Sequence, residues 1–394
     1  MQKGGCVMPY NALDFFAGAG GLSEGLRMAG IDVVYANEID RWAKMTYERN
    51  HSETVFECGD ISAVTRETID HALHSRFEFG VEEIDIMAGG PPCQGFSIIG
   101  QRNIDDPRNR LFREFLRLVQ QIQPKVFIME NVFGLLSMQN GRVKDEIIEA
   151  FTDAGYIVAE PKVLSACDFG VPQFRRRVFF LGLRQDLSRN PLTYPQPTHA
   201  AIQQNGLPAY VNVGNAISDL PEYVVESKGI DEGEAIDYRT DAMTAYQQIM
   251  RGDRQNIYNH HTKRFLDARM ERIAMLGEGA TKVSLPAELQ VGGHENKYRR
   301  LSYKEPSPTL TAHMSKDLSD FVHPKYNRPI TVREAARIQS FPDNYIFLGS
   351  EFQQLKQIGN AVPPLLGMAV AQSVVQQLDQ ILQMPDIHLA VANV

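Results

Sequence analysis

The segment GGPPCQGFS, residues 89–97, places a cysteine between two prolines and a Gln-Gly pair. It directly follows the apolar run Ile84–Ala88, which is typical of a buried strand. Because prolines restrict the backbone, they would hold the sulfur of Cys93 in one position at the end of that strand. A thiolate is well suited to reversible addition to a carbon atom. Cys93 is therefore a candidate nucleophile.

Three other segments indicate a site for a nucleoside cofactor. The glycine-rich segment 14–21 follows a predicted strand and opens a helix, where backbone N–H groups can approach a ligand. It does not fit the dinucleotide pattern G-x-G-x-x-G, because Ser23 occupies the third glycine position. Glu38, at the end of the second predicted strand, can accept hydrogen bonds from two ribose hydroxyls. Asp60, beside the apolar Ile61, can accept one from an exocyclic amine, and together the three segments describe an adenosyl site.

The elements that must position these residues alternate between short apolar runs and helical patterns. This alternation predicts βαβ units and an α/β fold with a doubly wound, mostly parallel sheet. Ligands of such a sheet bind at the C-terminal ends of its strands. The predicted strands are Ala12–Phe16, Val33–Asn37, Thr54–Phe56, Ile84–Ala88, Val126–Glu130 and Val178–Leu183. The predicted helices are Leu22–Met28, Ala43–Arg49, Leu111–Ile122, Val143–Ala154 and the long closing helix Pro363–Ile381.

The length of 394 residues allows one large core and a second, smaller domain. Prolines crowd into residues 191–197, where we place a domain boundary. Regular patterning returns at Thr331–Phe341. We therefore expect a first domain over residues 1–190, an inserted domain over 191–310 and a return segment over 311–394.

Composition and charge narrow the classes of function. The net charge of −8 argues against a protein that coats nucleic acid over its whole surface. Between Arg251 and Lys304, however, eleven bases face six acids, and Arg299 and Arg300 in this stretch are candidates for phosphate contacts. A solvated helix of mixed charge explains the same pattern equally well. The four cysteines lack C-x-x-C spacing, so we expect neither a disulfide framework nor a metal site.

The sequence was also searched for membrane spans and a signal peptide. No apolar run approaches the roughly 18 residues of a membrane span, and the N-terminal residues lack the apolar region of a signal peptide. We therefore expect a cytoplasmic protein that does not enter a membrane.

Six ordered motifs resemble those of the cytosine-C5 DNA methyltransferase family of bacterial restriction-modification systems. They are DFFAGAGG at 14–21, PPCQGFS at 91–97, ENV at 130–132, QFRRR at 173–177, REAAR at 333–337 and GNAV at 359–362. The resemblance extends through most of the catalytic portion. It implies a Rossmann-like methyltransferase fold that uses S-adenosyl-L-methionine, with a target-recognition domain at residues 191–310.

The resemblance also implies the reaction, a methyl transfer to C5 of a cytosine flipped out of a specific sequence in double-stranded DNA. Cys93 would add to ring carbon C6, and protonated Glu130 would bond the ring N3. Arg175 and Arg177 would contact the pyrimidine carbonyl, Glu130 and a nearby phosphate. The enzyme is expected to act as a monomer, with any cognate restriction endonuclease acting separately.

Binding residues carried over by motif form two sets. The cofactor set comprises Phe16, Gly18, Ala19, Gly20, Gly21, Glu38, Ile39, Asp60, Ile61, Pro92, Leu111, Asn360 and Ala361. The segment 95–110 would close over the flipped base, with Ser97 and Arg108 near phosphate.

Three alternatives remain open. A tRNA cytosine-C5 methyltransferase uses the same scaffold, but such enzymes tend to carry a Cys-Phe-Thr tripeptide, which this sequence lacks, and a smaller insert. A non-catalytic regulator would keep the fold without the chemistry, although Cys93, Glu130 and the adenosyl set are intact. A nicotinamide oxidoreductase is disfavoured by Ser23.

Overall fold

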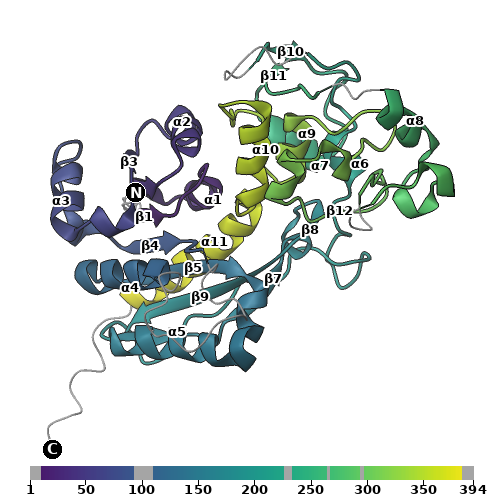
Figure 1. Cartoon of the computed structure of the whole chain (residues 1–394). Helices are drawn as coiled ribbons and strands as arrows, with labels where there is room; N and C mark the ends of the chain where they lie inside the picture. The colour runs from purple at the N-terminus through teal and green to yellow at the C-terminus, as the bar shows by residue number, and fades with distance from the viewer. Residues whose placement is uncertain (1–9, 93–109, 226–232, 264–266, 293–296, 384–394) are drawn as a thin grey trace, which may run out of the picture.

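The computed structural model describes residues 10–92, 110–225, 233–263, 267–292 and 297–383. Its centre is an eight-stranded sheet, in which β1 to β5 run parallel and β9 runs antiparallel to its neighbours (Figure 1). The strands are β1 Asn11–Phe15, β2 Asp32–Glu38, β3 Val55–Cys58, β4 Ile86–Gly89, β5 Val126–Val132, β6 Tyr156–Val158, β7 Lys162–Ser165 and β9 Arg176–Arg184. Their order is β3-β2-β1-β4-β5-β9-β6, with β7 also paired to β9. Because the order reverses between β1 and β4, the sheet is doubly wound, as predicted.

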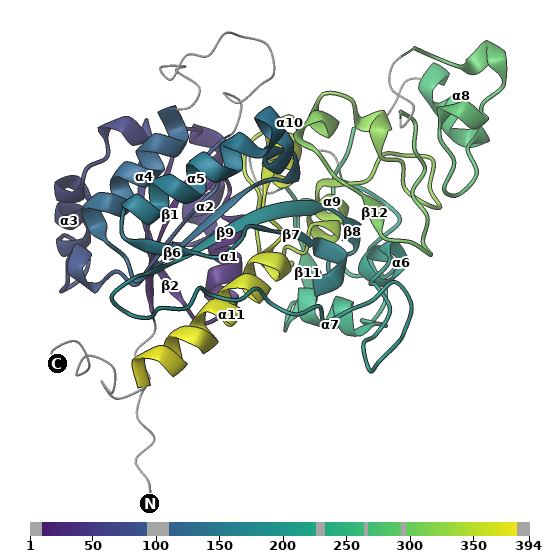
Figure 2. The same cartoon turned by 90° about the horizontal axis from the view of Figure 1, so that it is seen from below.

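Both faces of the sheet are covered by helices. Alternate residues of each central strand enter different cores, so that Ala12 faces one core and Leu13 the other. The first core is shared with α1 Gly21–Met28 and α11 Pro364–Gln383, and the second with α3 Arg66–His74, α4 Arg110–Ile122 and α5 Arg142–Asp153 (Figure 2). The remaining helix of this part, α2 Arg41–Asn50, packs beside β2 and β3.

A second region lies beside the sheet (Figure 1). It contains α6 Val213–Ile217, β10 Ile236–Asp237, α7 Ala245–Arg251, β11 Asn256–Ile257, α8 Asp267–Met275 and α9 Val332–Ile338. Part of it has a small apolar cluster of its own, formed by Ile273, Leu276, Leu285, Tyr298 and Val322. Two short strands, β8 Gln173–Phe174 and β12 Ser307–Pro308, pair the first region with the second.

A buried ion network joins α9 to α7 and to Asp219 inside the second region. The guanidinium of Arg337 in α9 contacts the carboxylates of Asp343 and Asp219 at 2.6 and 3.2 Å. Arg251 in α7 contacts Asp219 from the other side at 2.6 Å. All four charges are therefore paired, as buried charges in proteins usually are.

The predicted strands and helices are all present, within a few residues of their predicted bounds. The pattern missed α3, α10 Glu351–Asn360 and the short strands β6 and β7. It also predicted none of the short elements between β7 and α9 other than β9. Helix α10 lies directly before α11, and the stretch 351–383 is long and apolar enough, by length and composition, to cross a membrane. However, 61% of its most apolar window is buried within the chain, where α11 packs along α1. This stretch is therefore a core element of the fold.

Candidate active site

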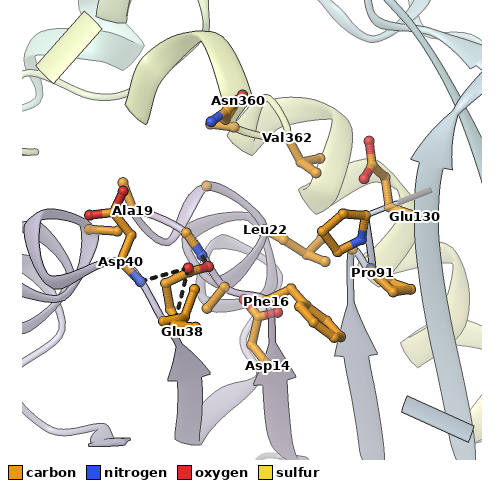
Figure 3. A pocket seen from close by; sticks show the side chains of 18 of the residues that line it. Asp14, Phe16, Ala19, Leu22, Glu38, Asp40, Pro91, Glu130, Asn360 and Val362 are labelled. Atoms are coloured by element: carbon orange, nitrogen blue, oxygen red, sulfur yellow. Dashed lines mark hydrogen bonds between the residues drawn. The ribbon is translucent and has the colours of Figure 1, made fainter. Parts of the chain in front are cut away.

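A cavity of about 660 Å³ opens at the C-terminal ends of β1, β2, β4 and β5. Figure 3 shows Glu38 and Asp40 at one end of it, Glu130 at the other, and Asn360 and Val362 across from the glycine turn. Gly20 and Arg175 are not among its lining residues. The predicted site residues that line it are Phe16, Gly18, Ala19, Gly21, Glu38, Ile39, Asp60, Ile61, Pro92, Leu111, Glu130, Arg177, Asn360 and Ala361.

The glycine-rich turn has a strained backbone. Phe16 has φ 56°, a left-handed conformation that costs a residue with a side chain about 1 to 3 kcal/mol. Gly18 has φ 55°, and a Cβ there would point into open space at the cavity. A Cβ on Gly21 would lie 2.4 Å from the carbonyl oxygen of Val362. The turn therefore needs glycine at Gly21 in order to pack against the C-terminal segment.

Glu38 is held by three backbone groups. One carboxylate oxygen accepts the Gly18 N–H at 3.0 Å, and the other accepts the N–H groups of Ile39 and Asp40, both at 2.9 Å. A carboxylate has about four lone-pair positions. The geometry therefore leaves one position on Oε2 for a ligand, where the sequence suggested bonds to two ribose hydroxyls.

Two further acidic residues lie near the same end of the cavity. The side chain of Asp60 caps a short 3₁₀ helix at Ile61–Ala63 and accepts the N–H of Ser62 at 2.9 Å. Asp40 caps α2 and forms an ion pair with Lys356 of α10 at 2.8 Å. Lys356 also lines the cavity, so α10 supplies part of its wall.

Glu130 and Arg177 form the polar pair at the other end. They lie on the antiparallel strands β5 and β9, and the Nε of Arg177 is 2.7 Å from Oε1 of Glu130. Glu130 is only 9% exposed, and this burial raises the pKa of its carboxyl, although the positive charges of Arg177 and Arg175 oppose the shift. The protonated form of Glu130 is thereby favoured relative to an exposed glutamate.

Asn131 connects this pair to the proline segment. Its amide donates to the carbonyl of Pro91 at 2.8 Å, and its side-chain oxygen accepts the N–H of Val132 at 2.9 Å. The end of β5 thus holds the backbone two residues before Cys93. Cys93, Ser97, Arg108 and the segment 95–109 lie outside the described residues.

Two arginines have partners that the sequence did not reveal. Arg175 is fully buried and donates to the carbonyls of Leu310, Gly359 and Ala361 at 2.7 to 3.0 Å. It therefore positions the end of α10, and its charge also opposes the rise in the pKa of Glu130. Its expected contacts with the pyrimidine and a phosphate stay predictions.

The structure corrects the prediction that Arg300 contacts phosphate. It is 4% exposed, and its guanidinium donates to the carbonyls of Ile273 and Leu276 at the C-terminal end of α8. It also binds the carbonyls of His323 and Tyr326 and the side chain of Asn327. The carbonyls that end a helix need such donors, so Arg300 is not available to phosphate. Arg299 is half-buried.

Asp14 is a site residue that the sequence analysis did not select. It lines the cavity, is 1% exposed, and accepts a 2.5 Å hydrogen bond from Ser23, whose hydroxyl also lies 2.8 Å from that of Tyr47. Burial is the main cause that raises the pKa of Asp14 to about 7, and the charge of Glu38 adds to it. The signal was present, because Asp14 is an acid within the predicted strand that leads into the glycine turn, but only residues after it in the segment were assigned a role.

Comparison with known proteins identifies the family. Residues 10–376 match the family described as C-5 cytosine-specific DNA methylase. This chain belongs to that family. It is therefore a DNA cytosine-5-methyltransferase, and the methyl donor of this family is S-adenosylmethionine.

Relatives with known names cover nearly the whole chain. The Type II methyltransferase M.AgeI of Thalassovita gelatinovora is 38% identical, over 92% of this chain and 98% of its own length. The Type II methyltransferase M.DdeI of Desulfomicrobium norvegicum is 40% identical, over 92% of this chain and 88% of its own.

Solved structures agree with the fold. A DNA modification methyltransferase encoded within an Escherichia coli prophage superposes with a TM-score of 0.76 at 28% identity, over 94% of this chain and 99% of that one. The Schizosaccharomyces pombe Dnmt2 methyltransferase superposes with a TM-score of 0.58 at 17% identity, over 95% and 100% of the two chains. The second likeness concerns the fold alone.

Proposed function

We propose that this enzyme methylates C5 of a cytosine that is flipped out of a specific sequence in double-stranded DNA, through a covalent bond between Cys93 and C6. The observation that carries the proposal is that Glu38 and the Glu130–Arg177 pair line one cavity. A methyl donor held at Glu38 and a pyrimidine held at Glu130 would meet inside it. The Type II methyltransferases among the relatives support a role in DNA modification beside a separately acting restriction endonuclease.

The residues at the first end of the cavity fit S-adenosylmethionine. Oε2 of Glu38 has one lone-pair position left for a ribose hydroxyl, Phe16 offers an aromatic ring, and the space beside Gly18 is open. Asp60 and Ile61 would receive the adenine, with Ile39, Pro92, Leu111, Asn360 and Ala361 completing the wall. When bound, the cofactor supplies the methyl group as an electrophile.

The residues at the second end would activate the base. The Cys93 thiolate forms an S–C6 bond, and the electron pair displaced from the ring double bond is stabilised as Glu130 gives a proton to N3. C5 would thereby become nucleophilic and take the methyl group, and the electron pair of the broken sulfur–methyl bond would stay on the sulfur of the donor. A base then removes the C5 proton, the S–C6 bond breaks, and the thiolate of Cys93 and the proton on Glu130 are regenerated.

Arg177 and Glu130 would have different roles in this step. Arg177 holds Oε1 of Glu130, so Oε2 is the oxygen that would carry the proton to N3. Because burial raises the pKa of Glu130, the carboxyl can hold that proton even beside the arginine.

The predicted division of the chain is part of this proposal, although α9, within the return segment, packs against α6 of the second region. Residues 1–190 and 311–394 would form the catalytic domain, and residues 191–310 would recognise the target sequence in the major groove. Arg299, Ser97 and Arg108 are the proposed phosphate contacts. We propose that the enzyme acts as a monomer in the cytoplasm.

DNA with 5-fluorocytosine at the target position tests the mechanism. Fluorine cannot be removed as a proton, so the methylated adduct cannot collapse and should survive denaturation, one enzyme per site, only with S-adenosylmethionine present. The Cys93→Ala variant should form no adduct, whereas Cys58→Ala, which removes an exposed cysteine, should form it normally. Normal turnover of the fluorinated site, or an adduct mapped to Cys58 or Cys167, would overturn the proposal. An adduct with tRNA but not with duplex DNA would reassign the substrate.

A further inference from the structure

A strip of exposed side chains borders the end of the cavity that holds Glu130. It consists of Val132, Phe133, Phe174 and Arg176, which we call the rim strip. Val132, Phe133 and Phe174 are 41%, 45% and 49% exposed, and Arg176 is also exposed. Phe174 packs edge-on against the ring of Tyr210 and still stays about half exposed, and exposed large apolar side chains of this kind often mark a contact surface.

The rim strip arises from strand alternation. Arg175 is buried and Arg177 lines the cavity, while Phe174 and Arg176, at the alternate positions, are exposed. On the neighbouring strand Glu130 is buried, and the chain reaches the surface at Val132 and Phe133, where β5 ends. Val132 pairs with Arg177 across the two strands and lines the cavity with Glu130 and Arg177. Phe174 and Arg176 lie on the other side of the strand end, where Arg176 stacks on Phe133, so the strip begins at the cavity wall and continues onto the outer surface.

Arg176 is the charged member of the strip. Its guanidinium carbon lies 4.1 Å from the centroid of the Phe133 ring, so the aromatic face holds the cation in place. Among the residues that the structure describes, no carboxylate forms an ion pair with Arg176. Its charge is thus both oriented and available to an anion.

We propose that the rim strip contacts the DNA strand beside the flipped cytosine, with Arg176 on a backbone phosphate and Phe133 against the adjoining sugar or base. This inference rests on the proposed function, in which the cytosine enters the cavity at Glu130. A flipped base stays attached to a sugar and two phosphates, so the surface bordering the cavity must face the backbone. An unpaired guanidinium has the complementary charge and geometry for phosphate, and an exposed ring can pack on a nucleotide.

The charge is tested by Arg176→Gln, with Arg189→Gln as a matched control, because Arg189 is another exposed arginine after the end of β9. Binding of duplex DNA would be measured across a range of salt concentrations. If Arg176 neutralises one phosphate, its loss should reduce the log–log salt slope by about 0.9, and Arg189→Gln should leave the slope unchanged. Equal slopes for Arg176→Gln and Arg189→Gln would overturn the assignment.

The ring is tested by Phe133→Ala and Phe133→Leu, with Leu382→Ala as a control for loss of an exposed apolar side chain at the end of α11. Phe133→Ala should raise the KM for DNA about tenfold and lower the fluorescence gain of 2-aminopurine at the target position, while S-adenosylmethionine affinity and Tm stay at wild-type values. Phe133→Leu should restore part of the loss. A KM for DNA like that of Leu382→Ala would refute the role of the ring.

These outcomes separate the two proposals. If the wild-type enzyme forms the 5-fluorocytosine adduct on Cys93 and the rim variants bind DNA normally, the rim proposal alone fails. If the wild type forms no adduct although Arg176→Gln changes the salt slope, the covalent mechanism alone fails.

Discussion

Replacing Glu38 by glutamine tests the cofactor end of the cavity, and the geometry sets the size of the effect. Three of about four lone-pair positions on the carboxylate accept backbone N–H groups, from Gly18, Ile39 and Asp40. One position remains for a ribose hydroxyl. A hydrogen bond to a charged group contributes about 1.5 to 3 kcal/mol, so Glu38→Gln should weaken S-adenosylmethionine binding by about 10- to 150-fold.

Glutamine is more informative than alanine at this position. Its single carbonyl oxygen can keep the bonds to Ile39 and Asp40, while its amide group faces the Gly18 N–H and cannot accept it. The substitution therefore removes the acceptor oxygen that faces the ligand and preserves most of the local backbone support. Alanine would release all three N–H groups and mix a loss of stability with the loss of affinity.

Titration calorimetry with S-adenosylmethionine measures the effect, and thermal unfolding checks the fold. The matched control is Glu57→Gln, a carboxylate at the neighbouring strand end that accepts from the hydroxyl of Tyr35 at 2.5 Å and is not among the cavity-lining residues. Its affinity for the cofactor should equal that of the wild type. A Kd for Glu38→Gln within twofold of the wild type would refute the assignment, and a loss beyond about a thousandfold would refute the count of one bond.

Two more predictions concern residues found only in the structure. The pKa of Asp14 is about 7 in the fold against an ordinary value of 3.8, so the folded chain holds a proton that the unfolded chain releases between these values. The free energy of unfolding should therefore fall as pH rises from about 4 to about 7, by on the order of 4 kcal/mol in total. In denaturant titrations, Asp14→Asn should remove this contribution to the pH dependence. An unchanged pH dependence in the variant would contradict the prediction. Asn131→Ala removes the 2.8 Å hydrogen bond to the Pro91 carbonyl. It should lower the single-turnover methylation rate about a hundredfold without changing cofactor affinity, because Cys93 loses its alignment. A wild-type rate would show that the position of Pro91 does not depend on this bond.

The sequence was a good guide to residues placed by the sheet itself. The glycine turn, Glu38 and Glu130 each follow an apolar strand, and parallel strands bring their C-terminal ends to one edge. Once the strands were predicted correctly, the meeting of these residues in one cavity followed from topology. The contact between Arg177 and Glu130 was expected only from the family resemblance, and the pairing of β9 with β5 accounts for it.

The hydrogen-bond partners of the arginines could not be predicted from strand positions or local charge. Arg175 and Arg177 share a side of the chain, yet one binds carbonyls of Leu310, Gly359 and Ala361 while the other faces the cavity. Arg300 differs from Arg299 by one position but supplies donors to the end of α8. The net charge of a sequence window cannot distinguish a buried arginine from one that is free to bind phosphate. The difference depends on which backbone carbonyls the tertiary fold brings within hydrogen-bond distance of each guanidinium.

The C-terminal segment completes a cavity that begins with the first strand. The hydroxyl of Tyr345 donates to the carbonyl of Ala19, 326 residues away in the sequence, and Lys356 pairs with Asp40 across 316 residues. Local patterns predicted α2, which follows Asp40, but missed α10, which carries Lys356. They do not reveal the partners in either contact, since each contact depends on how the C-terminal segment docks. The close approach of Gly21 to the Val362 carbonyl requires that docking to be tight. The proposed cofactor site therefore depends on both ends of the chain: the first strands would supply its acceptors, and α10 and the segment before α11 form part of its wall.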